Sequence, residues 1–215
     1  MGVGPRALAC LALLAAACRA PAERDAGTWT DRFDVRREAL RSTGRNPFFI
    51  LEPGYRLVLE DRAERLVISV LPETRIVDGV ETRVVEERET VGERTIEVSR
   101  NYYAIDPATG DVYYFGEDVD VYRNGQVVSH EGSWLAGVNG ARFGLAMPGR
   151  PVAGARYYQE IAPGAAMDRA EIVRMDDSVL VVRESTPLEP MNREHKSYRR
   201  GVGLVEDGTL RLVRT

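Results

Sequence analysis

The sequence predicts a mainly β protein: an antiparallel meander that forms a curved sheet, an open barrel or a sandwich, with one short N-terminal helix. The first observation is that short segments of alternating apolar and polar residues follow one another from Asn46 onward. The second is that tight-turn dipeptides separate several of them, at Asp78-Gly79, Asn124-Gly125 and Asp207-Gly208. The third is that no helical pattern lies between the segments. Strands joined by such short turns pair antiparallel with their neighbours.

Residues 1–17 are predicted to be a signal peptide. Arg6 supplies the positive start, and the apolar run from Ala7 to Ala17 is too short to cross a bilayer core of about 30 Å as a helix. The run ends in small residues before Cys18, which resembles the lipobox of bacterial lipoproteins. The leucine that usually stands three residues before the cysteine is one position further out here, at Leu14.

The cysteine pattern supports a lipid anchor at Cys18. The chain has 2 cysteines, and both lie in or at the end of the leader, so the exported domain cannot form a disulfide. We therefore expect Cys18 to carry diacylglycerol and palmitate, with residues 18–28 as anchor and tether and the protein held at the membrane of the cell envelope, facing the periplasm or the exterior. The alternative is cleavage after Ala17 and secretion as a soluble protein.

Composition and charge predict one globular domain over residues 29–215. The formal net charge of the 215-residue chain is −4, and the absence of a basic patch argues against a nucleic-acid partner. Almost all basic residues are arginine, and Lys196 is the only lysine. We interpret this bias as a property of the genome. The expected partners are the membrane, through the lipid, and an unknown ligand or envelope protein.

The elements can be placed in chain order. The helix is predicted over Asp31–Thr43, with Thr30 or Asp31 as its cap and Gly44 at its end. The predicted strands are Tyr55–Glu60, Leu66–Leu71, Arg75–Val77, Val80–Glu86, Thr95–Tyr103, Asp111–Phe115, Val119–Tyr122, Gln126–His130, Tyr157–Ile161, Ala170–Met175, Val179–Glu184, His195–Arg199 and Leu210–Val213.

The stretch from Gly132 to Gly154 interrupts this series. It contains six glycines and two prolines, with Trp134 near its start. A connection of this length is uncommon unless it covers a face or forms a site. We therefore expect it to take part in ligand binding.

Several segments resemble a family of uncharacterised bacterial secreted proteins and lipoproteins, and the resemblance covers most of the chain after residue 45. The family has no established activity, so the resemblance implies a location and supplies no catalytic residues. One departure is that Val179–Glu184 runs straight through where a hairpin with a glycine turn is expected. The segments are Asn46–Gly54, Ile76–Glu86, Tyr103–Asp118, Val128–Ala141, Tyr158–Glu160 and Thr186–Pro190.

Carboxylates and aromatic residues provide the candidate binding site. Glu117 and Asp118 follow an aromatic strand and a glycine, Glu131 and Trp134 open the glycine-rich stretch, and Glu160 ends a later strand. Exposed aromatic rings beside carboxylates are typical of sugar- or peptide-binding surfaces. Further carboxylates recur at Asp168, Glu171 and Glu184.

The adjacent aromatic residues Tyr102-Tyr103 and Tyr113-Tyr114 each lie on a predicted strand. Neighbours on a strand point to opposite faces, so one of each pair should enter the core. The other should be exposed or line a groove. The simpler interpretation is that these rings form cross-strand pairs that stabilise the sheet.

No motif predicts a metal site, a cofactor or a catalytic residue. The sequence lacks HExxH, GxSxG, GxxxxGK[ST] and GxGxxG patterns. Asp106–Asp111 resembles a calcium loop but has alanine and glycine where an EF-hand needs oxygen ligands. It is interpreted as a β-turn capped by Asp106, with calcium bound among Asp106, Asp111, Glu117, Asp118 and Asp120 as the alternative.

The first functional hypothesis is a non-catalytic envelope lipoprotein that binds a ligand or partner through its curved sheet and the Gly132–Gly154 stretch. The second is a carboxylate-dependent hydrolase that acts on envelope or extracellular polymers, because paired carboxylates can act as acid and base. The third is a structural role in the envelope. Carboxylates that face one another in a cleft would favour the enzyme, an apolar cavity would favour a hydrophobic ligand, and a solid core would favour the structural role.

Overall fold

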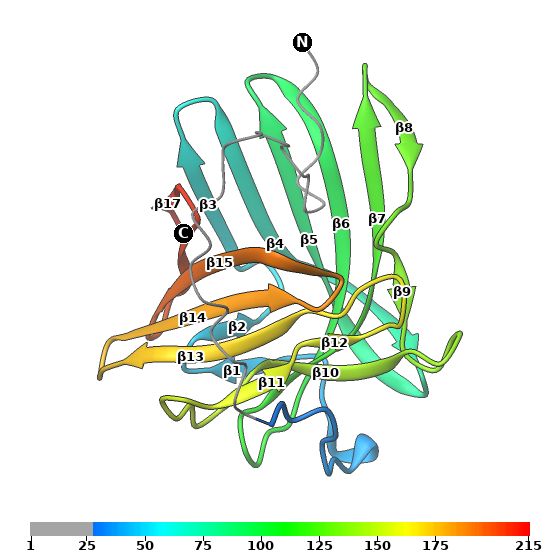
Figure 1. Ribbon diagram of the computed structural model, residues 1–215, viewed down its shortest axis with the longest axis vertical. Helices are drawn as coiled ribbons and strands as arrows, with labels where there is room; N and C mark the ends of the chain where they lie inside the picture. The colour runs from blue at the N-terminus through cyan, green and yellow to red at the C-terminus, as the bar shows by residue number, and fades with distance from the viewer. Residues whose placement is uncertain (1–27) are drawn as a thin grey trace.

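The computed structural model describes residues 28–215, and the predictions for the signal peptide and for Cys18 lie outside this range. The described chain forms one 15-stranded antiparallel sheet, nearly closed into a barrel, with a small two-stranded β1–β2 hairpin beside it (Figure 1). The mainly β, antiparallel architecture predicted from the sequence is confirmed. Within residues 28–215 no helix is long and apolar enough to cross a membrane.

The sheet winds in the order β11-β13-β14-β15-β16-β17-β3-β4-β5-β6-β7-β10-β12, and β8 and β9 pair with β7. The strand bounds are β1 Gly44–Asn46, β2 Phe49–Leu51, β3 Arg56–Asp61, β4 Glu64–Val77, β5 Val80–Val91, β6 Arg94–Ile105, β7 Val112–Arg123, β8 Gln126–Ser129, β9 Trp134–Leu135, β10 Arg142–Met147, β11 Arg156–Tyr158, β12 Glu160–Ile161, β13 Arg169–Met175, β14 Val179–Thr186, β15 Glu189–Arg199, β16 Gly203–Asp207 and β17 Leu210–Arg214.

The predicted turns connect neighbouring strands. Asp78-Gly79 joins β4 to β5, and Asn124-Gly125 joins β7 to β8. Both residues of each turn have positive φ: 49° and 79° in the first, and 53° and 77° in the second. A two-residue hairpin turn of this kind matches the twist of its strands, and asparagine, aspartate and glycine tolerate it best.

The last strand of the chain completes the wall. β17 pairs with β3, so the C-terminal half of the sheet, β13–β17, continues directly into the N-terminal half, β3–β7. In Figure 1, β13–β15 cross β3–β7 at a steep angle, and this crossing encloses the interior. Val179–Glu184 lies within β14, which pairs on both sides, so the straight run seen in the sequence forms a continuous wall strand.

The N-terminal helix predicted over Asp31–Thr43 is wrong. Only Arg37–Ala39 forms a single 3-10 turn, and the residue before it, Arg36, is extended and makes no side-chain cap. The apolar periodicity of this segment is weak, and its backbone instead pairs with the sheet, where Arg41 forms an antiparallel bridge with Ile105. Sheet contacts therefore replace the helical hydrogen bonds.

The Gly132–Gly154 stretch is not a simple connection, because it contains β9 and β10. Its glycines allow close backbone contacts. A Cβ at Gly144 would lie 2.3 Å from the carbonyl oxygen of Gln159, and one at Gly149 would lie 2.0 Å from that of Thr109. The glycine content therefore reflects packing of β10 against its neighbours.

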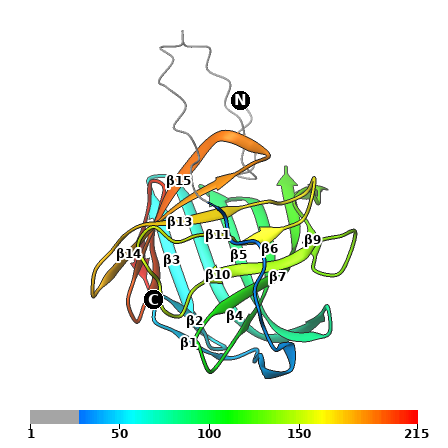
Figure 2. The ribbon, with the colours of Figure 1, turned by 60° about the horizontal axis from the view of Figure 1, so that its bottom comes forward.

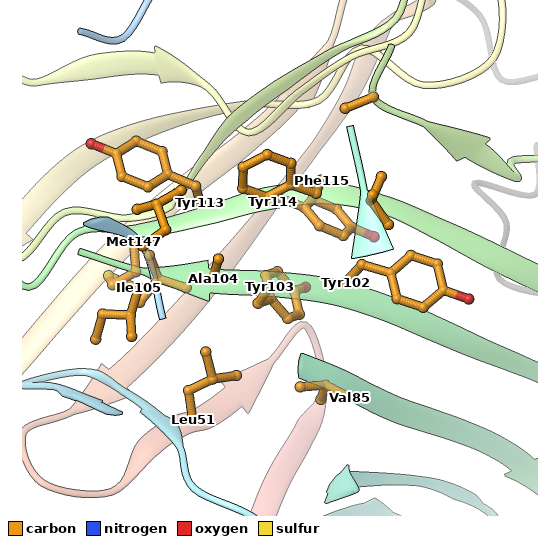
Figure 3. Close-up of a cluster of buried hydrophobic side chains, with 14 of the residues drawn as sticks. Leu51, Val85, Tyr102, Tyr103, Ala104, Ile105, Tyr113, Tyr114, Phe115 and Met147 are labelled. Atoms are coloured by element: carbon orange, nitrogen blue, oxygen red, sulfur yellow. The ribbon is translucent and has the colours of Figure 1, made fainter. Parts of the chain in front are cut away.

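Both tyrosines of each adjacent pair are buried, one on each face of the sheet. The inward ring of each pair lines the cavity, but the outward ring is covered and not exposed as one alternative predicted. Tyr103 and Tyr114 stack at 4.7 Å between ring centroids and line the barrel interior. Tyr113 points away from Tyr114, as Figure 3 shows. It is 5% exposed because Phe33 of the N-terminal segment packs on it edge to face at 6.1 Å. The N-terminal segment that covers the outer face of the sheet therefore buries the outward ring.

Candidate functional site

The barrel encloses a cavity with two connected parts. An inner chamber of about 250 Å³ and an outer chamber of about 530 Å³ share several lining residues. Exposed residues such as Gly132 and Gly164 line the outer chamber, which therefore forms the mouth. The β1–β2 hairpin supplies Phe48, Phe49 and Ile50 to the inner chamber. Figure 2 shows the barrel with its lower end turned toward the viewer.

Several carboxylic side chains line this cavity, and we call six of them the acidic cluster. They come from strands on both sides of the barrel and from the residue just before β13. Five of the six line both chambers, as does Lys196. The acidic cluster consists of Glu87, Glu97, Glu117, Glu160, Asp168 and Glu184.

Strand alternation places these side chains. Along β5, Val85, Glu87 and Glu89 point inward, whereas Glu86 and Arg88 point outward and form an ion pair at 3.2 Å. On β6, Glu97 lies directly opposite Glu89. Strand alternation therefore sends Glu86 and Arg88 to solvent and Glu87 and Glu89 to the interior.

Lys196 is the single basic residue among the described residues that line the cavity. Its ammonium lies 2.8 Å from the Glu184 carboxylate. Gln159 donates a second hydrogen bond to Glu184, at 2.9 Å. Burial lowers the pKa of Lys196, but the charges of Asp207 and Glu184 outweigh it and hold that pKa well above its usual range. Lys196 is therefore a fixed cation that neutralises one member of the acidic cluster.

Glu160 is the most enclosed member, and the indole Nε1 of Trp134 donates a hydrogen bond to its Oε2 at 2.7 Å. Asp168 forms side-chain hydrogen bonds with Glu160 and Thr186. A hydrogen bond between two carboxyl groups requires a proton on one of them. The proximity of the two carboxyl groups therefore raises the pKa of Glu160, in addition to the larger effect of burial.

Glu117 stands on β7 beside Tyr114, whose hydroxyl forms short hydrogen bonds in the interior. That hydroxyl donates to the Oδ1 of Asn101 and also lies within hydrogen-bond reach of the Glu117 carboxyl. Tyr114 and Asn101 come from adjacent strands that pair in register. The pair fixes the Glu117 side chain at the junction of the two chambers.

Burial raises the pKa values of the carboxyl groups in the cluster. It raises the pKa of Glu87 to about 7 and that of Glu117 to about 8, and neighbouring carboxylates add to both shifts. The pKa of Glu97 is raised to about 7 by burial and by the charge of Glu87. Burial also raises the pKa of Asp168 to about 6 and places that of Glu160 well above its usual range. The carboxyl groups of the interior are therefore partly protonated near neutral pH.

The structure brings four of the five predicted binding residues together. Glu117, Glu131 and Glu160 line the outer chamber, and Trp134 holds Glu160. Asp118 is not part of this group. It points to the outer face of β7, where its Oδ2 lies 2.6 Å from the guanidinium of Arg75. The two neighbours are separated because adjacent residues of a strand face opposite sides.

Sequence reasoning missed Glu87, Glu97 and Lys196. A signal for Glu87 was the run Val85-Glu-Glu-Arg-Glu89, in which Glu87 and Glu89 share a face with the apolar Val85. The signal for Lys196 was its being the only lysine in an arginine-rich chain. These strands face one another across the interior only because the barrel closes, and no local sequence pattern indicates that closure.

The aspartates of the predicted calcium alternative do not converge. Asp106 accepts a hydrogen bond from the backbone of Ala108 at 2.8 Å and caps its own turn, and Asp111 accepts one from the backbone of Gly149 at 2.7 Å. Among residues 28–215 no three His, Cys, Asp or Glu side chains are arranged to hold a metal ion. The capped β-turn predicted at Asp106 is present.

Comparisons with protein-family models, curated proteins and solved structures found no match for this chain. The resemblance to uncharacterised secreted proteins and lipoproteins therefore stays a prediction, and the cavity is the feature that bears on function.

Proposed function

We propose that this chain is a membrane-anchored envelope lipoprotein whose β barrel binds a small ligand non-catalytically in its interior. The observation that carries the proposal is the cavity itself, which has an aromatic and aliphatic floor, a ring of carboxyl groups and an open mouth. Small-molecule sites in proteins are concave and combine apolar walls with a few placed polar groups, in about 300–1,000 Å³. Barrels are a common scaffold for such sites.

The ligand-binding proposal can be tested with Trp134 as a reporter. The chain has 2 tryptophans, so Trp29→Phe leaves only Trp134, whose indole contacts Glu160 at the cavity. A screen of small charged and neutral metabolite-like compounds should give a saturable change in fluorescence with a 1:1 stoichiometry for at least one compound. If no compound gives such a change in the folded protein, the interior is not a binding site.

A matched pair of variants locates the response. Ser99 is 8% exposed and lines the inner chamber. Ser99→Phe fills that space and should abolish the response. Val127, 43% exposed on β8, lies away from the cavity, so Val127→Phe should leave it unchanged. An equal response from both variants would place the compound on the outer surface.

The hydrolase remains the second candidate, because carboxyl groups of the acidic cluster face one another in the cavity and burial raises their pKa values. The inner chamber, lined by the β1–β2 hairpin residues Phe48 and Phe49, has a volume of only about 250 Å³. This favours a small ligand over a polymer. Release of new chain ends from cell-wall polymers by the native protein, lost in Glu160→Gln, would instead establish the enzyme.

The lipid anchor proposed at Cys18 has its own test. Cells that express the full chain in the presence of a palmitate analogue should label the protein and retain it in the membrane fraction. Cys18→Ala should abolish the label and release the protein. Cys10→Ala is the matched control and should retain both. Unchanged labelling in Cys18→Ala would show that the anchor assignment is wrong.

A further inference from the structure

We propose that the barrel selects an organic cation, a primary ammonium group carried on a short apolar body. The inference rests on the proposed ligand-binding function and names the ligand's chemistry. The acidic cluster provides six carboxyl groups, and Lys196 pairs with one of them, Glu184. The other five acidic side chains of the cluster, from four strands and the residue just before β13, thus face the cavity without an ion-pair partner on its lining.

Two buried polar atoms point independently to a missing ligand. The Oε2 atom of Glu97 and the hydroxyl of Tyr157 are enclosed, yet neither has a hydrogen-bond partner within the described residues. Buried polar groups without partners are rare, because each costs the free energy of its lost hydration. A bound molecule that offers N–H donors would satisfy the Glu97 oxygen.

The strand register aims the Tyr157 side chain at the interior. Tyr157 lies opposite Ala170 on β13, and Ala170 lies opposite Glu184 on β14. Directly paired residues of an antiparallel sheet share a face, so Tyr157 and Glu184 project from the same side. Tyr157 is 3% exposed, and its hydroxyl lies on the inner side of the wall, where the charge of Glu184 adds to the effect of burial in raising its pKa.

The apolar part of the lining indicates that the rest of the ligand is apolar. Phe48, Phe49 and Ile50 enter the inner chamber from the β1–β2 hairpin, and Leu57 and Ile68 enter from β3 and β4. The carboxyl groups lie on the other strands, nearer the mouth. An alkyl or aryl group would pack against the hairpin residues while its ammonium group remains among the carboxyl groups.

An ammonium group fits the acidic cluster better than a bare metal ion does. It carries three N–H donors and can bridge carboxyl groups several ångströms apart. A calcium or magnesium ion needs its oxygen ligands at about 2.0–2.6 Å. No described group of three acidic, histidine or cysteine side chains approaches such an arrangement.

The test uses calorimetric titration of the full chain at pH 7 with three probes of the same body: hexylamine, 1-hexanol and hexanoate. Hexylamine should bind 1:1, at least about tenfold tighter than 1-hexanol, because charge-assisted hydrogen bonds to carboxylates are strong. Hexanoate should not bind. Calcium chloride serves as the fourth probe and should bind more weakly than hexylamine.

Neighbouring residues on β7 provide the matched variants. Glu117 faces the cavity, whereas Asp118 faces outward and pairs with Arg75. Glu117→Gln should weaken hexylamine at least about tenfold and leave 1-hexanol within about twofold. Asp118→Asn should change neither. The retained binding of 1-hexanol shows that Glu117→Gln is folded.

The outcomes separate this inference from the function on which it rests. Equal or tighter binding of 1-hexanol or hexanoate overturns the selection for cations and leaves the barrel a ligand-binding protein. If calcium binds more tightly than hexylamine, the proposed ammonium ligand is wrong and a metal ion takes its place. If none of the four probes binds and the fluorescence screen is also negative, the binding function itself is wrong.

Discussion

The free energy of unfolding is expected to fall as the pH rises from about 5 to about 8, in contrast to proteins whose carboxylates are paired and favour the ionised form. Burial raises the pKa values of Glu87 and Glu97 to about 7 and that of Glu117 to about 8. In the unfolded chain these groups ionise near pH 4.5. Between the two values the folded state therefore binds more protons, and stability decreases with pH.

The expected size of this loss is large. The shift of Glu87 alone, from its ordinary pKa of 4.5 to about 7, corresponds to about 3 kcal/mol at roughly 1.4 kcal/mol per pH unit. The contributions are not additive, because ionisation of each group raises the pKa of the others. Urea unfolding followed by circular dichroism at pH 5 and at pH 8 measures the difference directly.

The variant Glu87→Gln should reduce the pH slope and increase stability at pH 8, because it removes an acid that must ionise inside the barrel. The matched control is Glu93→Gln, which removes a carboxylate from the exposed turn between β5 and β6. This control should keep the wild-type slope. A wild-type protein that gains stability from pH 5 to pH 8 would contradict the description of the interior.

The strand pattern of the sequence predicted much of the wall. The turns at Asp78-Gly79 and Asn124-Gly125 place β4, β5, β7 and β8, because their residues tolerate positive φ. The short strands β9 and β10 escaped prediction because tertiary packing forms them, as the close approach of Gly144 to Gln159 shows. The pairing of β17 with β3 is a long-range contact that no local pattern contains.

The strand pattern of the sequence also predicted part of the candidate site. Glu117 and Glu160 stood out because each ends or follows an aromatic strand segment, and both line the cavity. Asp118 was grouped with Glu117 by proximity in sequence, although strand alternation sends it to the other face. Glu97 looked like one more surface acid, because only barrel closure reveals which face of β6 is enclosed.

The affinity for hexylamine is expected to rise over the same pH range in which the free energy of unfolding falls. The ammonium group stays protonated throughout, since its pKa resembles that of lysine at about 10.4. The carboxyl groups that receive it must lose their protons first, and burial raises the pKa of Glu97 to about 7 and that of Glu117 to about 8. Displacement of one proton weakens binding about tenfold for each pH unit below these values.

Between pH 5 and pH 8 the affinity should therefore increase at least about a hundredfold. In Glu117→Gln the increase should be smaller, because one titrating group is gone. Asp118→Asn should retain the full dependence, since that carboxylate is paired with Arg75 on the outer face.

The most direct single measurement of the acidic interior is the number of protons released when hexylamine binds. Calorimetric titration at pH 6 in buffers of different ionisation enthalpy gives this number. A cation that enters a protonated carboxyl cluster must expel protons, so we predict release of about one proton or more for each bound hexylamine. Binding without proton release, or with proton uptake, would contradict the account.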